Sequence, residues 1–382
     1  MASIKKIKDS YRIRVSCGYD VNGKQVIKSM NYKPAQGLSN KQIEKEVNRQ
    51  AILFEEQCKH GQTVTAAKFE TFARDWFRDC AELRLKRLTL CSYHSMEKRI
   101  YAALGHIRID RISPIDIQKF VSTLVHAGLA PDNVKNHVRL VSVILNYAVK
   151  KRIITFNPCV TVTYPVAREV ERDFYSKEEV RQMLALLKNE DESKKPFAVF
   201  FTLAAFMGAR KGELVGLEWK DIDFENSMIS INRAYYYSSH EKTYYTDTPK
   251  TKTSRRSLKM PAHVMDTLKE YREWQDGQRE ICGGSWVETD RLFTKWNGEP
   301  MTPNAPSAYL TAFCKRTGMR KVNVHSFRHF NASALIDGGV DVVAVQAALG
   351  HSTPATTMSI YSHAFDNAKT RAMEAIANAI NL

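Results

Sequence analysis

The residues best suited to chemistry lie near the carboxyl end of the sequence. His325 and Arg328 form a His-x-x-Arg motif, Gly350 and His351 form a Gly-His pair, and Tyr361 follows ten residues after His351. Imidazole and guanidinium groups can surround one phosphate while a phenol attacks it. The pattern therefore predicts nucleophilic attack on a phosphate, and such a site needs a second Arg and a Lys from elsewhere in the chain.

A second Arg follows a long apolar run. The run from Pro196 to Met207 predicts a buried helix, and Arg210 comes three residues after its end. A residue directly after a buried helix is held in a fixed position by the protein core. Arg binds phosphate oxygens bidentately and stays charged. Glu213 could brace the segment by hydrogen bonds. The alternative is a surface Arg–Glu pair, which contributes little.

The overall charge favours a polyanionic partner. The 382 residues carry 57 Lys and Arg against 41 Asp and Glu, which gives a formal net charge of +16 at pH 7. Such an excess promotes binding to nucleic acid through phosphate neutralisation and counterion release. A basic protein without such a partner is the alternative.

The sequence argues against several other classes of protein. The seven cysteines include no Cys-x-x-Cys pair, which argues against a disulfide framework and a zinc module. The sequence contains neither a P-loop nor a His-Glu-x-x-His motif, so it gives no support to nucleotide hydrolysis or zinc-protease chemistry. The run from Pro196 to Ala209 is shorter than the roughly 20 residues that span a bilayer, and no signal peptide is visible, so a cytoplasmic protein without membrane contact is expected.

Residues 1–60 have the pattern of a small sheet backed by one helix. Apolar and polar residues alternate around Ile13 and Val15, Asn22-Gly23 is a hairpin turn signal, and Ser39 begins a capping box. The exposed strand face could lie on DNA or simply be solvated. Its basic residues are Arg12, Arg14 and Lys28.

The rest of the chain predicts two further domains. Residues 63–158 are expected to form a bundle of four or five helices, a linker is expected over 159–175, and 176–382 is expected to be a mixed α/β domain. The fold class is therefore multidomain α+β, mainly helical with small β-sheets. In the last domain the predicted strands are 227–236 and 244–260, and the predicted helices include 262–275, 304–317, 326–337, 341–348 and 366–380.

The ordered set of an Arg, a hairpin Lys, His-x-x-Arg, Leu-Gly-His and Tyr resembles the tyrosine recombinases. It is most similar to the three-domain integrases of phages and of integrative conjugative elements or conjugative transposons, and the resemblance covers essentially the whole chain. It implies an arm-type DNA-binding domain at 1–60, a SAM-like core-binding domain at 63–158 and a catalytic domain at 176–382.

The resemblance implies a role for each residue of the set. Arg210 and Arg328 would bind the non-bridging oxygens of the scissile phosphate. Tyr361 would be the nucleophile that forms a 3′-phosphotyrosyl intermediate. His325 would accept or hydrogen-bond the proton of the phenol, and His351 would orient the phosphate or the phenol. A helix-capping role is the alternative for His351.

The resemblance also implies a Lys on a β-hairpin that protonates the leaving 5′-oxygen. Lys250 fits best because it lies in a Pro-Lys-Thr sequence. Lys252 is the alternative, since it is two residues on and would share a strand face with Lys250. Two Arg, a Lys and His supply the positive charge, and the phosphotyrosine keeps the energy of the broken ester, so neither a metal nor a nucleotide cofactor is expected.

The implied function is conservative integration and excision of a mobile element through a Holliday junction. The implied partners are core-type and arm-type DNA attachment sites, three further copies of the chain in a synaptic tetramer, a directionality factor and a host DNA-bending protein. The helix at 366–380 would dock on its own domain or on a neighbouring protomer. A nucleoid-associated bacterial protein is expected.

Three other functions remain as alternatives. A chromosome-dimer resolvase or inversion enzyme shares the mechanism, but these enzymes usually lack a separate domain like residues 1–60. A topoisomerase-like DNA relaxer shares the Arg, Lys, His and Tyr chemistry. A catalytically silent DNA-binding regulator would not need six catalytic candidates.

Overall fold

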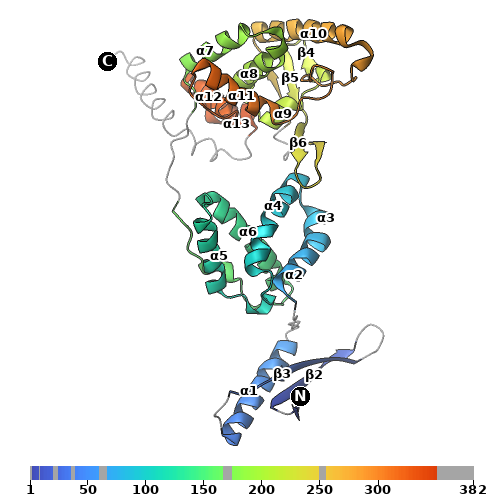
Figure 1. Ribbon diagram of the computed structural model, residues 1–382, viewed down its shortest axis with the longest axis vertical. Coiled ribbons are helices and arrows are strands. Elements are labelled where there is room, and N and C mark those ends of the chain that lie inside the picture. The colour runs from blue at the N-terminus through green and yellow to red at the C-terminus, as the bar shows by residue number, and fades with distance from the viewer. Residues whose placement is uncertain are drawn as a thin grey trace, which may run out of the picture. The chain divides into compact units, whose positions relative to one another are not determined.

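The computed structural model divides into two compact units, 1–169 and 170–382 (Figure 1). The predicted fold class is confirmed, because the elements are mostly helices with small antiparallel sheets. The described residues are 2–7, 9–19, 25–35, 39–59, 67–166, 174–248 and 255–350.

The chain begins with an antiparallel sheet in the order β1-β2-β3, followed by one helix. The elements are β1 (Ser3–Ile7), β2 (Ser10–Tyr19), β3 (Gln25–Tyr32) and α1 (Asn40–Lys59). Ile13 and Val15 of β2 are buried with Phe54 of α1, as the alternation predicts. Ser39 forms the predicted capping box at the start of α1: the Gln42 backbone N–H donates to Ser39 Oγ at 3.4 Å, and the Ser39 backbone N–H donates to Gln42 Oε1 at 2.9 Å. The predicted Asn22-Gly23 turn lies outside the described residues.

A helical bundle follows and confirms the prediction for this part of the chain. Its helices are α2 (Phe69–Trp76), a π turn (Phe77–Ala81), α3 (Glu82–Arg84), α4 (Arg87–Leu104), α5 (Pro114–His126) and α6 (Pro131–Lys150), with short 3-10 turns at Ile109–Arg111 and Pro158–Thr161. Ser113 and Asp116 form the capping box of α5, with Pro114 in its first turn. Apolar residues of α2, α4, α5 and α6 share one core.

Both ends of the predicted linker are packed. Cys159 is buried in the core of the helical bundle. Tyr175 is buried in the core of the second unit, and its hydroxyl donates to the Arg320 carbonyl at 2.7 Å. Residues 167–173 are outside the described part of the chain.

The second unit is built around α8, which is apolar on nearly all sides. Phe200, Phe201 and Leu203 of this helix are fully buried, and α8 packs against α7, α10, α11 and α12. The helices are α7 (Lys177–Lys188), α8 (Lys195–Met207), α9 (Lys211–Val215), α10 (Ala262–Cys282), α11 (Ala305–Thr317), α12 (Ser326–Asp337) and α13 (Val342–Leu349), with 3-10 turns at Glu192–Lys194, Trp219–Asp221 and Gly283–Ser285.

Two small antiparallel sheets complete this unit. The first has the order β4-β5-β8 and the second is the hairpin β6-β7. The strands are β4 (Ile222–Asp223), β5 (Met228–Ile231), β6 (Ala234–Ser238), β7 (Thr243–Asp247) and β8 (Arg256–Lys259). The predicted strand 227–236 is therefore two strands, because the side chains of Asn232 and Arg233 turn to the carboxylate of Asp221.

Candidate active site

The turn between α8 and α9 is held in one conformation by its surroundings. Gly208 ends α8 in the left-handed region, with φ = 56°. A Cβ there would lie 2.5 Å from Asn331 Oδ1 and 2.7 Å from Leu349 Cδ2, so only glycine fits. The Asn331 amide donates to the carbonyls of Ala205 and Phe206 at 2.9 and 3.0 Å, which satisfies the open end of α8.

Arg210 stands at the start of α9 and is braced by Glu213. Its Nη1 donates to Glu213 Oε1 at 2.7 Å, and its backbone N–H donates to Glu213 Oε2 at 3.0 Å. A further bond from Nη2 reaches the Gly350 carbonyl at 3.2 Å. The Glu213 side chain is 3% exposed, whereas that of Arg210 is 40% exposed. The predicted brace is confirmed, and the guanidinium keeps surface toward solvent.

Arg328 reaches the same turn from α12. Its Nη1 donates to the Gly208 carbonyl at 2.9 Å, and only 2% of the residue is exposed. His325 precedes α12 and is exposed, with its ring perpendicular to that of His329 at 4.8 Å between centroids. The structure thus brings the two predicted arginines to one turn and places the predicted His at the amino end of the helix that carries Arg328.

Arg256, at the start of β8, also belongs to this site. Its Nη2 donates to Glu213 Oε2 at 3.0 Å and its Nε donates to the Ala348 carbonyl at 2.6 Å. The sequence contained one signal for such a residue: Arg256 shares the inward face of β8 with Leu258. We call Arg210, Glu213 and Arg256 the active-site cluster.

The charges of Glu213 and Arg256 shift each other's pKa values. Burial alone would raise the pKa of Glu213, but the guanidinium groups of Arg256 and Arg210 outweigh it and hold that pKa below its ordinary value. Burial lowers the pKa of Arg256, and Glu213 opposes this effect. Glu213 is therefore a fixed negative charge between two cations.

The same cluster ties down the end of α13. The carbonyls of Ala348 and Gly350 accept from Arg256 and Arg210, respectively, and Gly350 is left-handed with φ = 67°. Cations at a helix carboxyl end also suit the helix dipole. His351 is the next residue, but it lies outside the described residues, together with Lys250, Lys252, Tyr361 and the predicted helix 366–380.

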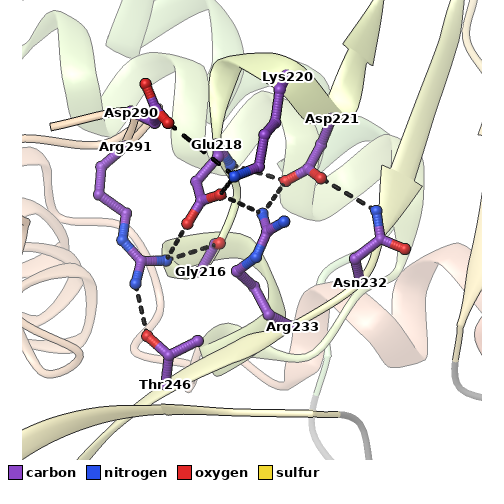
Figure 2. A network of polar contacts seen from close by, with 9 residues as sticks. All are labelled: Gly216, Glu218, Lys220, Asp221, Asn232, Arg233, Thr246, Asp290 and Arg291. Carbon is purple, nitrogen blue, oxygen red and sulfur yellow. Dashed lines mark hydrogen bonds and ion pairs between the residues drawn. The ribbon is translucent and has the colours of Figure 1, made fainter.

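A second polar cluster lies beyond the other end of α9 (Figure 2). Asp221 accepts from Arg233 and, at 3.0 Å, from the Asn232 amide. Arg291 donates to the Gly216 carbonyl at 2.8 Å and to Thr246 Oγ1 of β7 at 2.6 Å. Glu218 pairs with Arg233 at 3.1 Å and with Arg291 at 3.6 Å. We call Glu218, Asp221, Arg233 and Arg291 the hairpin cluster, because it ties the β6-β7 hairpin to the end of α9.

Two plain observations bear on other classes of site. Among the described residues, no helix is long and apolar enough to cross a membrane. Within the same residues, no three His, Cys, Asp or Glu side chains are grouped as metal ligands.

Comparison with known proteins identifies the family to which this fold and its arginine site belong. The model of the phage integrase family matches residues 173–368, which is more than half of the chain. The model of the SAM-like amino-terminal domain of phage integrases matches residues 68–125. The chain therefore belongs to the phage integrase family, and it is a tyrosine recombinase, as the sequence motifs predict.

Among the similar proteins are integrases of conjugative elements. It is 26% identical to the ICEBs1 integrase of Bacillus subtilis over 377 residues, which cover 96% of each chain. It is also 26% identical to the transposase from transposon Tn916 of Enterococcus faecalis, over 69% of this chain and 67% of that protein. The chain is thus similar to integrases and transposases of conjugative elements.

Solved structures share the fold at lower identity. The integrase of the Tn1549 transposon, solved in complex with a circular intermediate DNA, gives a TM-score of 0.69 at 21% identity, covering 81% of this chain and 100% of that one. A lambda integrase tetramer bound to a Holliday junction gives a TM-score of 0.55 at 16% identity, covering 94% of each chain.

Proposed function

We propose that this chain integrates and excises a mobile element by cleaving and rejoining DNA at attachment sites through a Holliday junction. The observation that supports this best is the approach of Arg210 and Arg328 to one rigid turn. Charge builds on the non-bridging oxygens of a phosphate in the transition state, so cations that are held in place before the reaction stabilise it most. Arg210 keeps exposed surface through which it can contact a phosphate.

The proposed cleavage step balances within the protein and the DNA. The Oη atom of Tyr361 attacks the phosphorus, a bond from phosphorus to that oxygen forms, and the bond from phosphorus to the 5′-oxygen breaks. His325 takes the proton of the phenol, whose ordinary pKa near 10 would otherwise limit attack at neutral pH. Lys250 gives a proton to the leaving 5′-oxygen, while His351 orients the phosphate.

Religation runs these steps in reverse, with the 5′-hydroxyl of the partner duplex attacking the phosphorus and Tyr361 leaving, and the second strand pair is then exchanged by the same chemistry. The intermediate is a 3′-phosphotyrosyl ester with a free 5′-hydroxyl. Because the ester keeps the energy of the broken bond, exchange proceeds without hydrolysis of a nucleotide.

The amino-terminal parts of the chain are proposed to hold the DNA. Residues 1–60 would bind arm-type sites, and 63–158 would bind core-type sites beside the catalytic domain 176–382. Arg12 and Arg14 lie on the face of β2 opposite Ile13 and Val15, which supports a basic contact surface. Four copies would assemble on two duplexes, with a directionality factor and a host DNA-bending protein as accessory partners.

A suicide DNA substrate tests the proposed function. Its nicked strand leaves after cleavage, so the covalent adduct accumulates and resists SDS. We expect an adduct with attachment-site DNA and none with Tyr361→Phe. A silent DNA-binding protein would form no adduct with the wild-type chain, and a DNA relaxer would form one with little sequence preference.

A sulfur-substituted substrate separates the two candidate lysines. In a 5′-bridging phosphorothiolate the leaving group is a thiolate, which departs without a proton. Lys250→Ala should lose cleavage of ordinary DNA and regain it on this substrate. Rescue of Lys252→Ala in place of Lys250→Ala would transfer the role to Lys252.

A further inference from the structure

Arg256 closes a ring of contacts that includes a proposed catalytic residue. Glu213 accepts from Arg210 through Oε1 at 2.7 Å and from Arg256 through Oε2 at 3.0 Å. Both guanidinium groups also reach the end of α13, where Arg256 Nε donates to the Ala348 carbonyl and Arg210 Nη2 donates to the Gly350 carbonyl. The ring therefore runs from Glu213 to Arg256, to the end of α13, to Arg210 and back to Glu213.

The ring joins segments that are distant in the sequence. The bond from Arg256 to Glu213 spans 43 residues and the bond from Arg256 to Ala348 spans 92. The Glu213 side chain is 3% exposed and that of Arg256 is 6% exposed, so water and salt screen their attraction little. With Glu213 held by Arg256, the rotamer of the Arg210 guanidinium is fixed by two anchored acceptors.

The chemistry of arginine suits this task. Nε and Nη2 lie on one edge of a planar fork, so one rigid group can donate to two acceptors at once. A lysine in this place has a single nitrogen on a flexible stem and cannot hold both acceptors in the same geometry. The loss on substitution by lysine therefore reports on geometry, because the positive charge is kept.

We propose that Arg256 is a positioning residue for strand cleavage. By holding Glu213 and the end of α13 in fixed positions, it fixes the orientation of the Arg210 guanidinium toward the scissile phosphate. The inference rests on the proposed function. Arg256 acts through Arg210, so its effect must depend on both the charge of the phosphate and the presence of Arg210.

The test is single-turnover cleavage by the full-length chain of two suicide substrates. One carries the natural phosphodiester and the other a methylphosphonate at the scissile position, where a neutral methyl group replaces a charged oxygen. We expect Arg256→Lys to cleave the phosphodiester about 100-fold more slowly than wild type, the scale of one lost transition-state donor. On the methylphosphonate, Arg256→Lys should be only a few-fold slower than wild type. Arg210→Ala should show about the same few-fold loss on that substrate.

A double-mutant cycle adds a second readout. If Arg256 works through Arg210, the variant Arg210→Ala/Arg256→Lys is no slower than Arg210→Ala alone. Losses that multiply, or a loss with Arg256→Lys that is equal on both substrates, would overturn the positioning role. The same double-mutant cycle is measured with Arg256→Gln, which keeps an amide donor without the charge. This variant replaces Arg256→Lys if the lysine variant is poorly folded.

Arg233→Lys is the matched control, since it makes the same change in a buried cluster that does not include Arg210. It should lower the melting temperature without altering the ratio of rates on the two substrates. The two proposals also fail differently. A wild-type chain without a covalent adduct would refute the proposed function, whereas a wild-type adduct with normal cleavage by Arg256→Lys would refute only the positioning role.

Discussion

Two arginine–carboxylate clusters lie at opposite ends of the short helix α9, and they differ in what they leave exposed. In the active-site cluster the side chain of Arg210 keeps 40% of its surface exposed. In the hairpin cluster the side chains of Arg233 and Arg291 are 17% and 12% exposed. The first cluster can still meet a ligand through a guanidinium, whereas both arginines of the second are committed to the protein.

The comparison shows which feature distinguishes Arg210 from the arginines of the hairpin cluster. Both clusters contain buried carboxylates, and both cross between segments distant in the sequence. A charged partner is therefore common to both roles. What differs is that Arg210 keeps exposed surface although Glu213 and the Gly350 carbonyl hold it, and this leaves a firmly held cation at the protein surface.

The largest expected effect is the loss of chemistry in Arg210→Ala. We expect cleavage of the suicide substrate to fall by about 1,000-fold or more, since a preorganised donor to the transition state is removed. Binding to attachment-site DNA should stay within about tenfold, because many other cations hold the duplex. Single-turnover cleavage and a gel-shift titration measure the two quantities.

The hairpin cluster supplies the contrast to that result. Arg291→Lys should retain cleavage close to that of the wild type wherever the protein is folded, as shown by circular dichroism. Loss of cleavage in folded Arg291→Lys as complete as in Arg210→Ala would erase the distinction between the two clusters.

The next effect is on stability, in Asp221→Ala. Asp221 is buried and accepts from Arg233 and Asn232, so its removal leaves a largely buried cation without its carboxylate. We expect the free energy of unfolding to fall by about 3 kcal/mol, at the lower end for a broken buried pair because Arg233 retains Glu218. Urea denaturation measures this change, and a value near zero would contradict it.

The pH dependence of Glu213→Gln tests the active-site cluster in a different way. The pKa of Glu213 is depressed in the folded chain, so the ionised carboxylate adds stability above its ordinary pKa of about 4.3 and loses that contribution as pH falls. The difference in unfolding free energy between wild type and Glu213→Gln should therefore narrow between pH 6 and pH 3.5. A constant difference across urea titrations at these pH values would show that the charge is not what matters.

Local patterns explain why much of the fold could be predicted from the sequence. The capping box at Ser39 forms as expected, because it needs only residues within one helical turn. The buried helix after Pro196 and the alternation in β2 follow from apolar periodicity. The prediction of two arginines at one site rested on ordered motifs, and the structure brings both to the α8–α9 turn.

The parts that could not be predicted depend on contacts between distant segments. Arg256 looks like one cation in a basic run, and its alternation with Leu258 indicates only that its side chain faces inward. Its bonds to Glu213 and Ala348 show its place in the site. The same holds for the break in the predicted strand 227–236, which occurs because Arg233 pairs with Asp221. Propensity and periodicity carry no information about such pairs.

The smallest expected effect comes from an ion pair outside both clusters. Arg279 pairs with Glu288, and both side chains are more than half exposed. Water and salt screen such a pair, so Arg279→Ala should change the free energy of unfolding by less than about 1 kcal/mol and leave cleavage unchanged. Urea denaturation at low and at about 0.5 M salt checks this, and the difference should vanish at the higher salt. A loss of unfolding free energy as large as that of Asp221→Ala would mean that burial does not explain why the hairpin cluster contributes more than a surface ion pair.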